Sequence, residues 1–198
     1  GHTELLHVHG LGRYTLLVKP SDDAAGEAFD KVAKMLGRPY PGGPALARAA
    51  EEGNAVAFAM PRPMIDSGDW DFSFAGIKTH VLYLLRDLRK NSIVPPVPDI
   101  AASFQEAMCD VLVAKTIHAA LANNVSSVII AGGVSANTRL REMMHEAHLS
   151  RGIRCLFPPL DVTGDNAAMI AIAAHVRSRL QEADDVFRVS ADQNSVLG

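Results

Sequence analysis

A short apolar run followed at once by two glycines is the feature that most constrains this chain. Residues 128–131 read Val-Ile-Ile-Ala, and Gly132 and Gly133 come directly after them. An uninterrupted run of this length predicts a central strand that is covered on both faces. A helix is expected to begin near Asn137. Strand, glycine turn and helix in succession predict an α/β or mixed-sheet fold with a ligand site off the carboxyl end of the strand.

The glycine turn itself has two interpretations. Gly132 and Gly133 allow a backbone to approach a ligand closely, and the free N–H groups of the following helix favour an anion or a polar ring edge. A tight strand–helix turn without a ligand explains the same residues about equally well. Asn137 could in that case be a plain helix N-cap.

The rest of the chain alternates between recognisable strands and helices. Residues 3–9 and 14–19 predict a hairpin. Asp99 is expected to cap a long helix that ends at 123–124. A last helix is expected to start near Asp165. Its predicted inner face consists of Met169, Ile172, Ala173, Val176 and Leu180.

An acidic helix over residues 22–36 offers carboxylates on one face. Asp23, Glu27 and Asp30 lie opposite its apolar stripe, and a carboxylate can accept hydrogen bonds from the neighbouring hydroxyls of a ribose. The spacing alone favours a solvated face, because Glu27–Lys31 is an acid-first i,i+4 pair. Gly26 weakens that interpretation, since a glycine inside a helix costs about 1 kcal/mol.

Three further positions have both a structural and a functional interpretation. Gly42 and Gly43 lie between prolines, and either form a turn or offer N–H groups to a sugar or phosphate. Asp165 opens a helix, either as a cap or as one ligand of a metal ion. Lys78 is a candidate for contact with a phosphate.

Composition excludes several classes of protein. No stretch approaches the roughly 20 apolar residues of a membrane span. The cysteines, Cys109 and Cys155, cannot build a disulfide framework, so a reducing cytoplasm is expected. Cys109 is expected to be structural. The net charge of −3 gives no global attraction to nucleic acid.

An RNA partner would therefore need a local basic patch. Arg139 and Arg141 form one candidate, and Arg86, Arg89 and Lys90 form another. Each group is equally well explained as the solvated face of a helix.

Taken together, six segments resemble the TsaD family of tRNA threonylcarbamoyladenosine transferases, formerly labelled O-sialoglycoprotein endopeptidases or glycoproteases. The segments occur in the order and spacing of the family. They are residues 1–5, 22–31, 40–44, 71–74, 131–137 and 165–171.

The resemblance implies an actin-like, sugar-kinase-like ATPase fold of the RNase H-like type, with two related halves. Residues 1–182 would be mainly the second, C-terminal half, with a helical insertion around 37–124. Residues 183–198 would be a polar tail. The chain is therefore expected to be a fragment of a longer enzyme.

The resemblance also implies an activity. Family members transfer a threonylcarbamoyl group from threonylcarbamoyl-adenylate to the adenosine beside the tRNA anticodon and release AMP. The implied partners are tRNA and TsaB-like and TsaE-like proteins, in the cytoplasm and without a membrane.

Site residues follow from the matching motif positions. Asp165 would be one ligand of a divalent ion such as iron, zinc or magnesium. The remaining residues would contact the nucleotide: Gly1 at the phosphate or carbamoyl group; Glu27, Asp30 and Gly43 at the ribose; and Gly132, Gly133 and Asn137 at the adenine.

The chain also departs from the family pattern. The His-x-x-x-His metal ligands of the family lie in the N-terminal half and are absent here, and Ala75 and Gly164 replace the usual residues. The chain alone is therefore expected not to catalyse transfer. Two alternatives stay open, a phosphotransferase or ATPase of the same fold and a non-catalytic dimerisation partner. The latter is expected to lose the metal and ribose carboxylates, whereas Asp30, Asn137 and Asp165 are all present.

Overall fold

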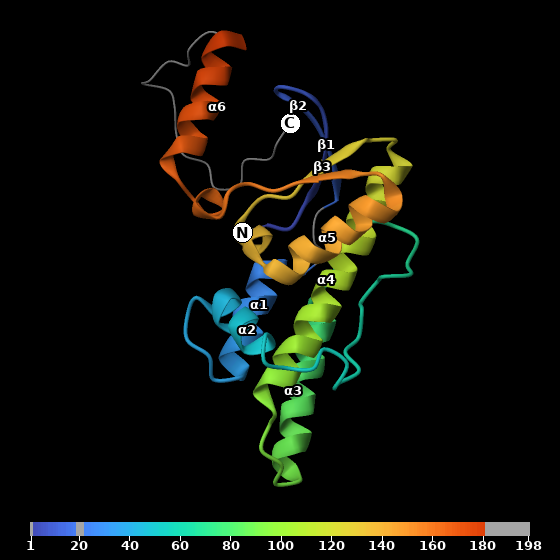
Figure 1. The fold of residues 1–198 in the computed structure, drawn as a ribbon, viewed down its shortest axis with the longest axis vertical. Coiled ribbons are helices and arrows are strands. Elements are labelled where there is room, and N and C mark those ends of the chain that lie inside the picture. Colours follow the sequence, from blue (N-terminus) through green and yellow to red (C-terminus); the bar gives the residue numbers. More distant parts are fainter. Residues whose placement is uncertain (1, 19–21, 181–198) are drawn as a thin grey trace.

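The structure is a computed structural model that describes residues 2–18 and 22–180 (Figure 1). It is a mixed α/β arrangement, as the sequence predicts. In chain order the elements are β1 (Leu5–Gly10), β2 (Arg13–Val18), α1 (Ala25–Met35), α2 (Gly42–Ala50), α3 (Ala75–Lys90), α4 (Val97–Ala122), β3 (Ser127–Ile129), η1 (Gly133–Ala136), α5 (Thr138–Arg151), β4 (Arg154–Leu156), η2 (Leu160–Val162) and α6 (Ala167–Leu180).

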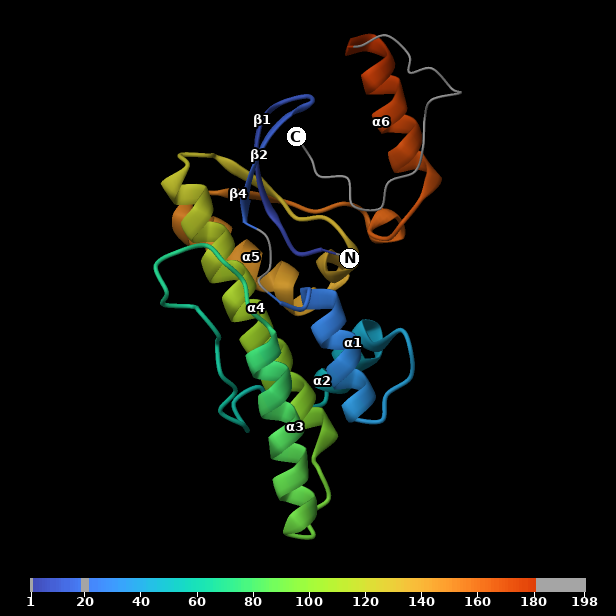
Figure 2. The ribbon, with the colours of Figure 1, turned by 180° about the vertical axis from the view of Figure 1, so that it is seen from behind.

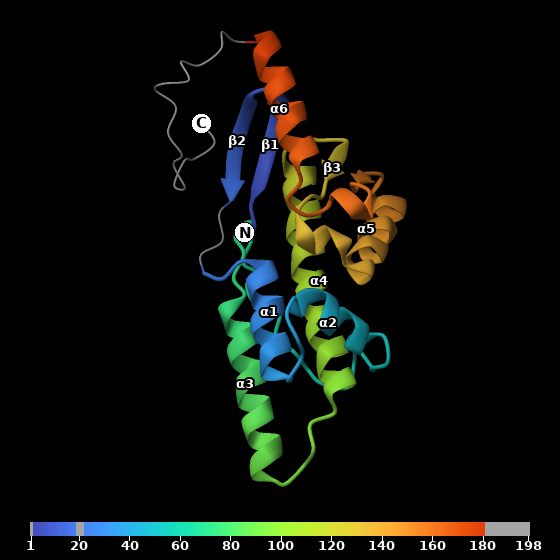
Figure 3. The ribbon, with the colours of Figure 1, turned by 90° about the vertical axis from the view of Figure 1, so that its left-hand side faces the viewer.

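The predicted hairpin is confirmed. Strands β1 and β2 pair antiparallel, with Leu5 opposite Val18 and His7 opposite Thr15. Gly12 adopts a φ of +71° in the connecting turn, a conformation that favours glycine. The hairpin and α6 lie toward one end of the molecule, and α1, α2 and α3 lie toward the other (Figures 1 and 3).

Helix α4 is the centre of the core. It packs against α2, α3 and α5, and the buried face of α1 packs in turn against α2 and α3 (Figure 3). Phe104 is fully buried and meets Phe29 of α1 edge to face, with 5.3 Å between ring centroids. A helix that is apolar around most of its circumference belongs in the interior, because each face needs a neighbour.

The predicted cap of this helix is wrong. Helix α4 begins at Val97 with Pro98 in its first turn, so Asp99 lies inside the helix. Its Oδ1 instead accepts a hydrogen bond of 2.8 Å from the backbone N–H of Asn54. Proline at the first positions of a helix removes an N–H that would otherwise need a cap.

The predicted central strand is only partly present. Strands β3 and β4 pair in parallel, with Val128 opposite Cys155, but they form a two-stranded sheet separate from the hairpin (Figure 2). Ile129 is 72% exposed, so the prediction of cover on both faces is wrong. A strand is covered on both sides only when further strands and helices surround it.

The predicted inner face of the last helix is likewise not covered. Helix α6 starts two residues after Asp165, close to the expected place, yet Met169 and Ile172 are 45% and 65% exposed. The predicted tail, residues 183–198, lies outside the described residues. None of the helices within residues 2–18 and 22–180 is long and apolar enough to cross a membrane.

Candidate functional site

Asp22, which lies just before α1, caps the N-terminus of another helix, α3. Asp22 accepts hydrogen bonds from the backbone N–H of Phe74 at 2.8 Å and of Ala75 at 3.3 Å, and from the hydroxyl of Ser73. Helix α3 has no side-chain cap from its own N-cap residue. Asp22 therefore supplies the cap from about 50 residues away, which no local pattern could have revealed.

The neighbouring aspartate joins the same two helices. Asp23 pairs with Lys31 at 2.8 Å and with Lys78 of α3. Hydrogen bonds from Lys31 and then Lys78 hold the pKa of the Asp23 carboxyl below its usual value. The predicted contact between Lys78 and a phosphate is not favoured, because its ammonium is engaged by Asp23.

Asp30 and the Gly42-Gly43 pair are brought together, although 11 residues separate Asp30 from Gly42. Oδ1 of Asp30 accepts hydrogen bonds from the N–H of Gly42 at 2.8 Å and of Gly43 at 3.1 Å. Pro41, the N-cap residue of α2, offers no side-chain cap. Asp30 thus caps α2 with one oxygen, and within the described residues its Oδ2 accepts no hydrogen bond.

Gly42 is required by this close approach. A Cβ at Gly42 would lie 2.7 Å from the Cα of Asp30 and 2.8 Å from the Cβ of Ala33. A Cβ at Gly43 would meet no heavy atom within 4 Å. The first glycine therefore serves the packing of α2 on α1, and the second leaves open space above the end of α2.

A hollow of about 250 Å³ opens beside this cap. Glu27 lies on its wall, and the predicted Glu27–Lys31 pair is formed at 2.6 Å. The other residues that line the hollow are Asp30, Lys31, Lys34, Arg38, Pro39, Tyr40 and Gly42. Charged residues surround the hollow, but the surface that it exposes is mostly apolar, and it is small compared with common ligand pockets.

The glycine turn after β3 packs on the first turn of α1. Gly132 has a φ of +84°, and η1 follows at Gly133. A Cβ at Gly26 would lie 3.5 Å from Cγ2 of Val134. The two regions with glycines that the sequence singles out, around Gly26 and at 132–133, are therefore neighbours in space.

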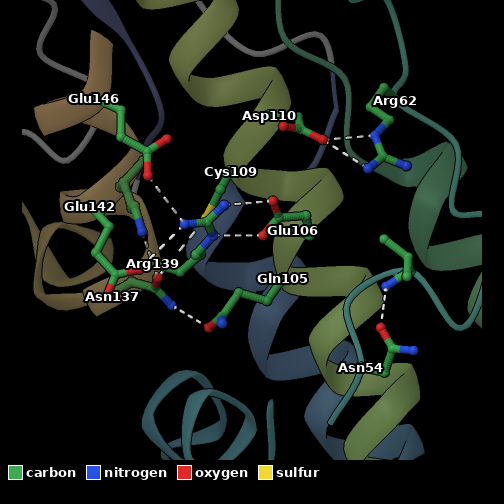
Figure 4. Close-up of polar contacts among 12 residues, drawn as sticks. Asn54, Arg62, Gln105, Glu106, Cys109, Asp110, Asn137, Arg139, Glu142 and Glu146 are labelled. Carbon is green, nitrogen blue, oxygen red and sulfur yellow. Dashed lines mark hydrogen bonds and ion pairs between the residues drawn. The ribbon is translucent and has the colours of Figure 1, made fainter. Parts of the chain in front are cut away.

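Asn137 is the N-cap of α5, as the structural interpretation held. Its Oδ1 accepts a hydrogen bond of 3.0 Å from the N–H of Leu140, and its Nδ2 donates to Gln105 of α4 at 2.7 Å (Figure 4). The side chain of Asn137 thus points toward α4, next to buried Cys109. Burial raises the pKa of the Cys109 thiol to about 12, which agrees with a structural role.

One of the two candidate RNA-binding groups is used inside the fold. Arg139 donates two hydrogen bonds to the carboxylate of Glu106, at 2.7 and 2.8 Å (Figure 4). Arg141 donates hydrogen bonds to the backbone oxygens of Ser135 and Pro158. The other group, Arg86, Arg89 and Lys90, lies on the exposed face of α3.

The last two predicted site residues are the least constrained. Asp165 is exposed in the turn between η2 and α6, and Figures 1 and 2 show α6 standing apart from helices α1 to α5. No group of three or more His, Cys, Asp or Glu side chains that could hold a metal ion occurs within the part of the chain that the structure describes. Gly1 lies outside that part.

Comparison with known proteins identifies relatives of this chain. A family model described as TsaD, tRNA N6-adenosine threonylcarbamoyltransferase, matches residues 1–172. The protein of that name from Verminephrobacter eiseniae is 51% identical over 177 residues, which cover 89% of this chain and 51% of the relative. The one from Paracidovorax citrulli is 52% identical over 177 residues, with the same shares covered. The chain thus spans about half the length of these relatives.

Among solved structures, the crystal structure of T. kodakarensis HypF is similar, with a TM-score of 0.52 and 20% sequence identity. The match covers 83% of this chain and 20% of that one. At this identity the likeness concerns the fold alone.

Proposed function

The chain belongs to the TsaD family, and from this we propose that the protein of which it forms part transfers a threonylcarbamoyl group from threonylcarbamoyl-adenylate to an adenosine beside the anticodon of tRNA. The observation that carries the proposal is the match of the family model over residues 1–172, together with curated relatives of this name at about 50% identity.

The proposed reaction is an acyl transfer. The exocyclic amine of the adenosine attacks the carbamoyl carbon, a new C–N bond forms, and the bond from that carbon to the phosphate oxygen breaks. AMP leaves with the electron pair, and the amine releases a proton. Because the acyl group is already activated, positioning of the amine against it supplies much of the rate enhancement.

The cap of α2 is the proposed ribose site. Oδ1 of Asp30 is held by the N–H groups of Gly42 and Gly43, so the carboxylate is fixed in direction. Oδ2 is then available to accept a hydrogen bond from a ribose hydroxyl, and the open space at Gly43 admits the sugar. Glu27, which lines the hollow beside this cap together with Asp30, is the second ribose candidate.

The glycine turn is the proposed adenine site. Gly132 and Gly133 carry no side chain that would block a flat ring, and a Cβ at either would meet no heavy atom within 4 Å. Asn137, at the end of this turn, is held in place because its side chain caps α5 and donates a hydrogen bond to Gln105. Gly1 is the proposed contact to the phosphate or carbamoyl group.

A divalent metal ion is part of the family resemblance, but this chain does not supply a complete site for it. Asp165 is proposed as one ligand, and a metal site needs several. No cluster of three ligating side chains accompanies Asp165 within residues 2–18 and 22–180. The other ligands would have to come from the remainder of the protein.

We further propose the actin-like organisation for the whole protein, with residues 1–182 as mainly its second half and residues 37–124 as a helical insertion. The likeness to HypF supports this at the level of the fold. TsaB-like and TsaE-like partners, tRNA and a cytoplasmic location complete the proposal.

A transfer assay on the whole protein tests this function. With tRNA, threonylcarbamoyl-adenylate and the partner proteins, the wild type should form threonylcarbamoyl-adenosine, and this chain alone should form none. Hydrolysis of ATP without transfer would instead indicate a phosphotransferase or ATPase. Absence of both nucleotide binding and transfer would indicate a non-catalytic partner.

The ribose site has its own variant. Asp30→Asn keeps an oxygen for the cap of α2 but removes the charge, so the dissociation constant for AMP should rise about tenfold, or 1.4 kcal/mol. Asp87→Asn on the exposed face of α3 is the matched control and should leave AMP binding unchanged. Equal AMP affinity of Asp30→Asn and wild type would refute this assignment.

A further inference from the structure

We infer that Arg141 is a positioning residue that clamps the glycine turn, residues 132–137, to the segment before α6, residues 157–165. The inference rests on the proposed function, since these segments carry the proposed adenine contacts and Asp165. Figures 1 and 3 show the two segments on the same side of α5.

The clamp is made by one guanidinium between two carbonyls. Nε of Arg141 donates to the backbone oxygen of Ser135 at 2.6 Å, and Nη2 donates to the backbone oxygen of Pro158 at 3.0 Å. The guanidinium also lies over the ring of Phe157, 4.8 Å from its centroid. A rigid helix thus holds both segments through a single planar group.

Within the described residues, Arg141 is the side chain that donates hydrogen bonds to both segments. Gly132 and Gly133 pack against no neighbouring atom at the place of a Cβ. Pro158 and Pro159 lack an N–H, so this stretch of backbone can be held only through its carbonyls. Loss of the guanidinium should therefore free both segments together.

Arginine suits this place for a geometric reason. Its donors form a fixed fork that points at two acceptors at once while the flat face stacks on an aromatic ring. A lysine ammonium is a flexible point charge and cannot do all three. Within the described part of the chain no carboxylate pairs with Arg141, so its positive charge is not cancelled beside the proposed site of an anionic nucleotide.

The buried hydroxyl of Ser135 supports the same inference. The residue is 1% exposed, and its Oγ is a buried side-chain atom without a hydrogen-bond partner in the structure. A buried hydroxyl without a partner is costly, so a loop that carries one must be held in place by other bonds. The bond from Arg141 to the carbonyl of the same residue is such a bond.

Arg139 provides the matched control. It lies on the same helix, two positions away, and its guanidinium binds Glu106 of α4 rather than either loop. Arg139→Gln should destabilise the contact between α4 and α5 without releasing the two segments.

The experiment compares Arg141→Lys, Arg141→Gln and Arg139→Gln in the whole protein. Hydrogen–deuterium exchange should accelerate about tenfold at the amides of 133–137 and 160–165 in both Arg141 variants, and remain unchanged there in Arg139→Gln. The KM for threonylcarbamoyl-adenylate and the dissociation constant for AMP should rise about tenfold in Arg141→Lys, with kcat changed by less than about threefold.

Unchanged exchange in Arg141→Lys, or faster exchange in only one of the two segments, would overturn the clamp. So would an AMP affinity equal to that of the wild type. If Arg141→Gln fails to fold, exchange and AMP binding in Arg141→Lys still test the clamp. Exchange reports on the clamp even if the wild type neither binds AMP nor transfers, so failure of the proposed function is distinguished from failure of this inference.

Discussion

The contact between α1 and α2 allows a comparison of two adjacent glycines. Gly42→Ala would place a Cβ 2.7 Å from the Cα of Asp30 and 2.8 Å both from the Cβ of Ala33 and from Oδ1 of Asp30. The Cα of Asp30 and the Cβ of Ala33 cannot move away by a side-chain rotation, so α2 must shift. Gly43→Ala would meet no heavy atom within 4 Å.

The magnitudes follow from these distances. Overpacking of this kind costs about 1–3 kcal/mol. The shift of α2 would also weaken the hydrogen bonds from Gly42 and Gly43 to Asp30, each contributing about 1 kcal/mol. Alanine regains up to about 1 kcal/mol of helix propensity. Gly42→Ala should therefore lower the free energy of unfolding by about 3 kcal/mol, and Gly43→Ala should leave it equal or raise it by about 0.5 kcal/mol.

Urea-induced unfolding of the two variants and the wild type measures both values. AMP binding adds a second measurement, because a methyl group at Gly43 would fill the space proposed for the ribose. Gly43→Ala should then lose AMP affinity without losing stability. A Gly42→Ala variant within 1 kcal/mol of the wild type, or equal destabilisation by both substitutions, would refute the packing argument.

Three further outcomes are expected elsewhere. Asp22→Ala removes the cap of α3 and should lower the free energy of unfolding by about 1–2 kcal/mol, whereas Asp22→Asn should retain part of it; no loss in Asp22→Ala would contradict the capping role. The lowered pKa of Asp23 means that its bonds to Lys31 and Lys78 stabilise the fold above the carboxyl's usual pKa and are lost as pH falls below about 4. Asp23→Asn should thus destabilise the protein more at neutral pH than at acid pH in urea unfolding, and an equal effect at both would count against the ion pairs. Cys109, with its pKa raised to about 12, should resist alkylation by iodoacetamide in the native protein at about pH 8 and react in denaturant, as read by mass spectrometry; rapid native labelling would show that the thiol is not buried.

The sequence by itself determined where most elements lie and which family the chain joins. The hairpin at β1–β2, the end of α4 at Asn123 and the start of α5 after Asn137 all follow from local signals. Turn glycines, caps and apolar periodicity act over a few residues, so they can be read from the chain directly. The ordered motifs identified the family for the same reason, since each is a contiguous string.

The tertiary structure decided what several of the polar side chains bind. Asp22 caps α3, Lys78 meets Asp23, and Arg141 joins Ser135 to Pro158. These partners lie between 6 and 55 residues apart, and no periodicity relates them. Asp30 combines both cases: its carboxylate was predicted from a motif, but its bonds to the amides of α2 depend on how the helices pack.

The same distinction explains the errors. An apolar strand such as β3 or an apolar stripe such as that of α6 indicates that a residue prefers to be covered, but not which element covers it. Ile129 and Ile172 are exposed because, within the described residues, packing of helices and strands brings no neighbour over them. Hydrophobicity is a property of each residue, whereas burial is a property of the assembled fold.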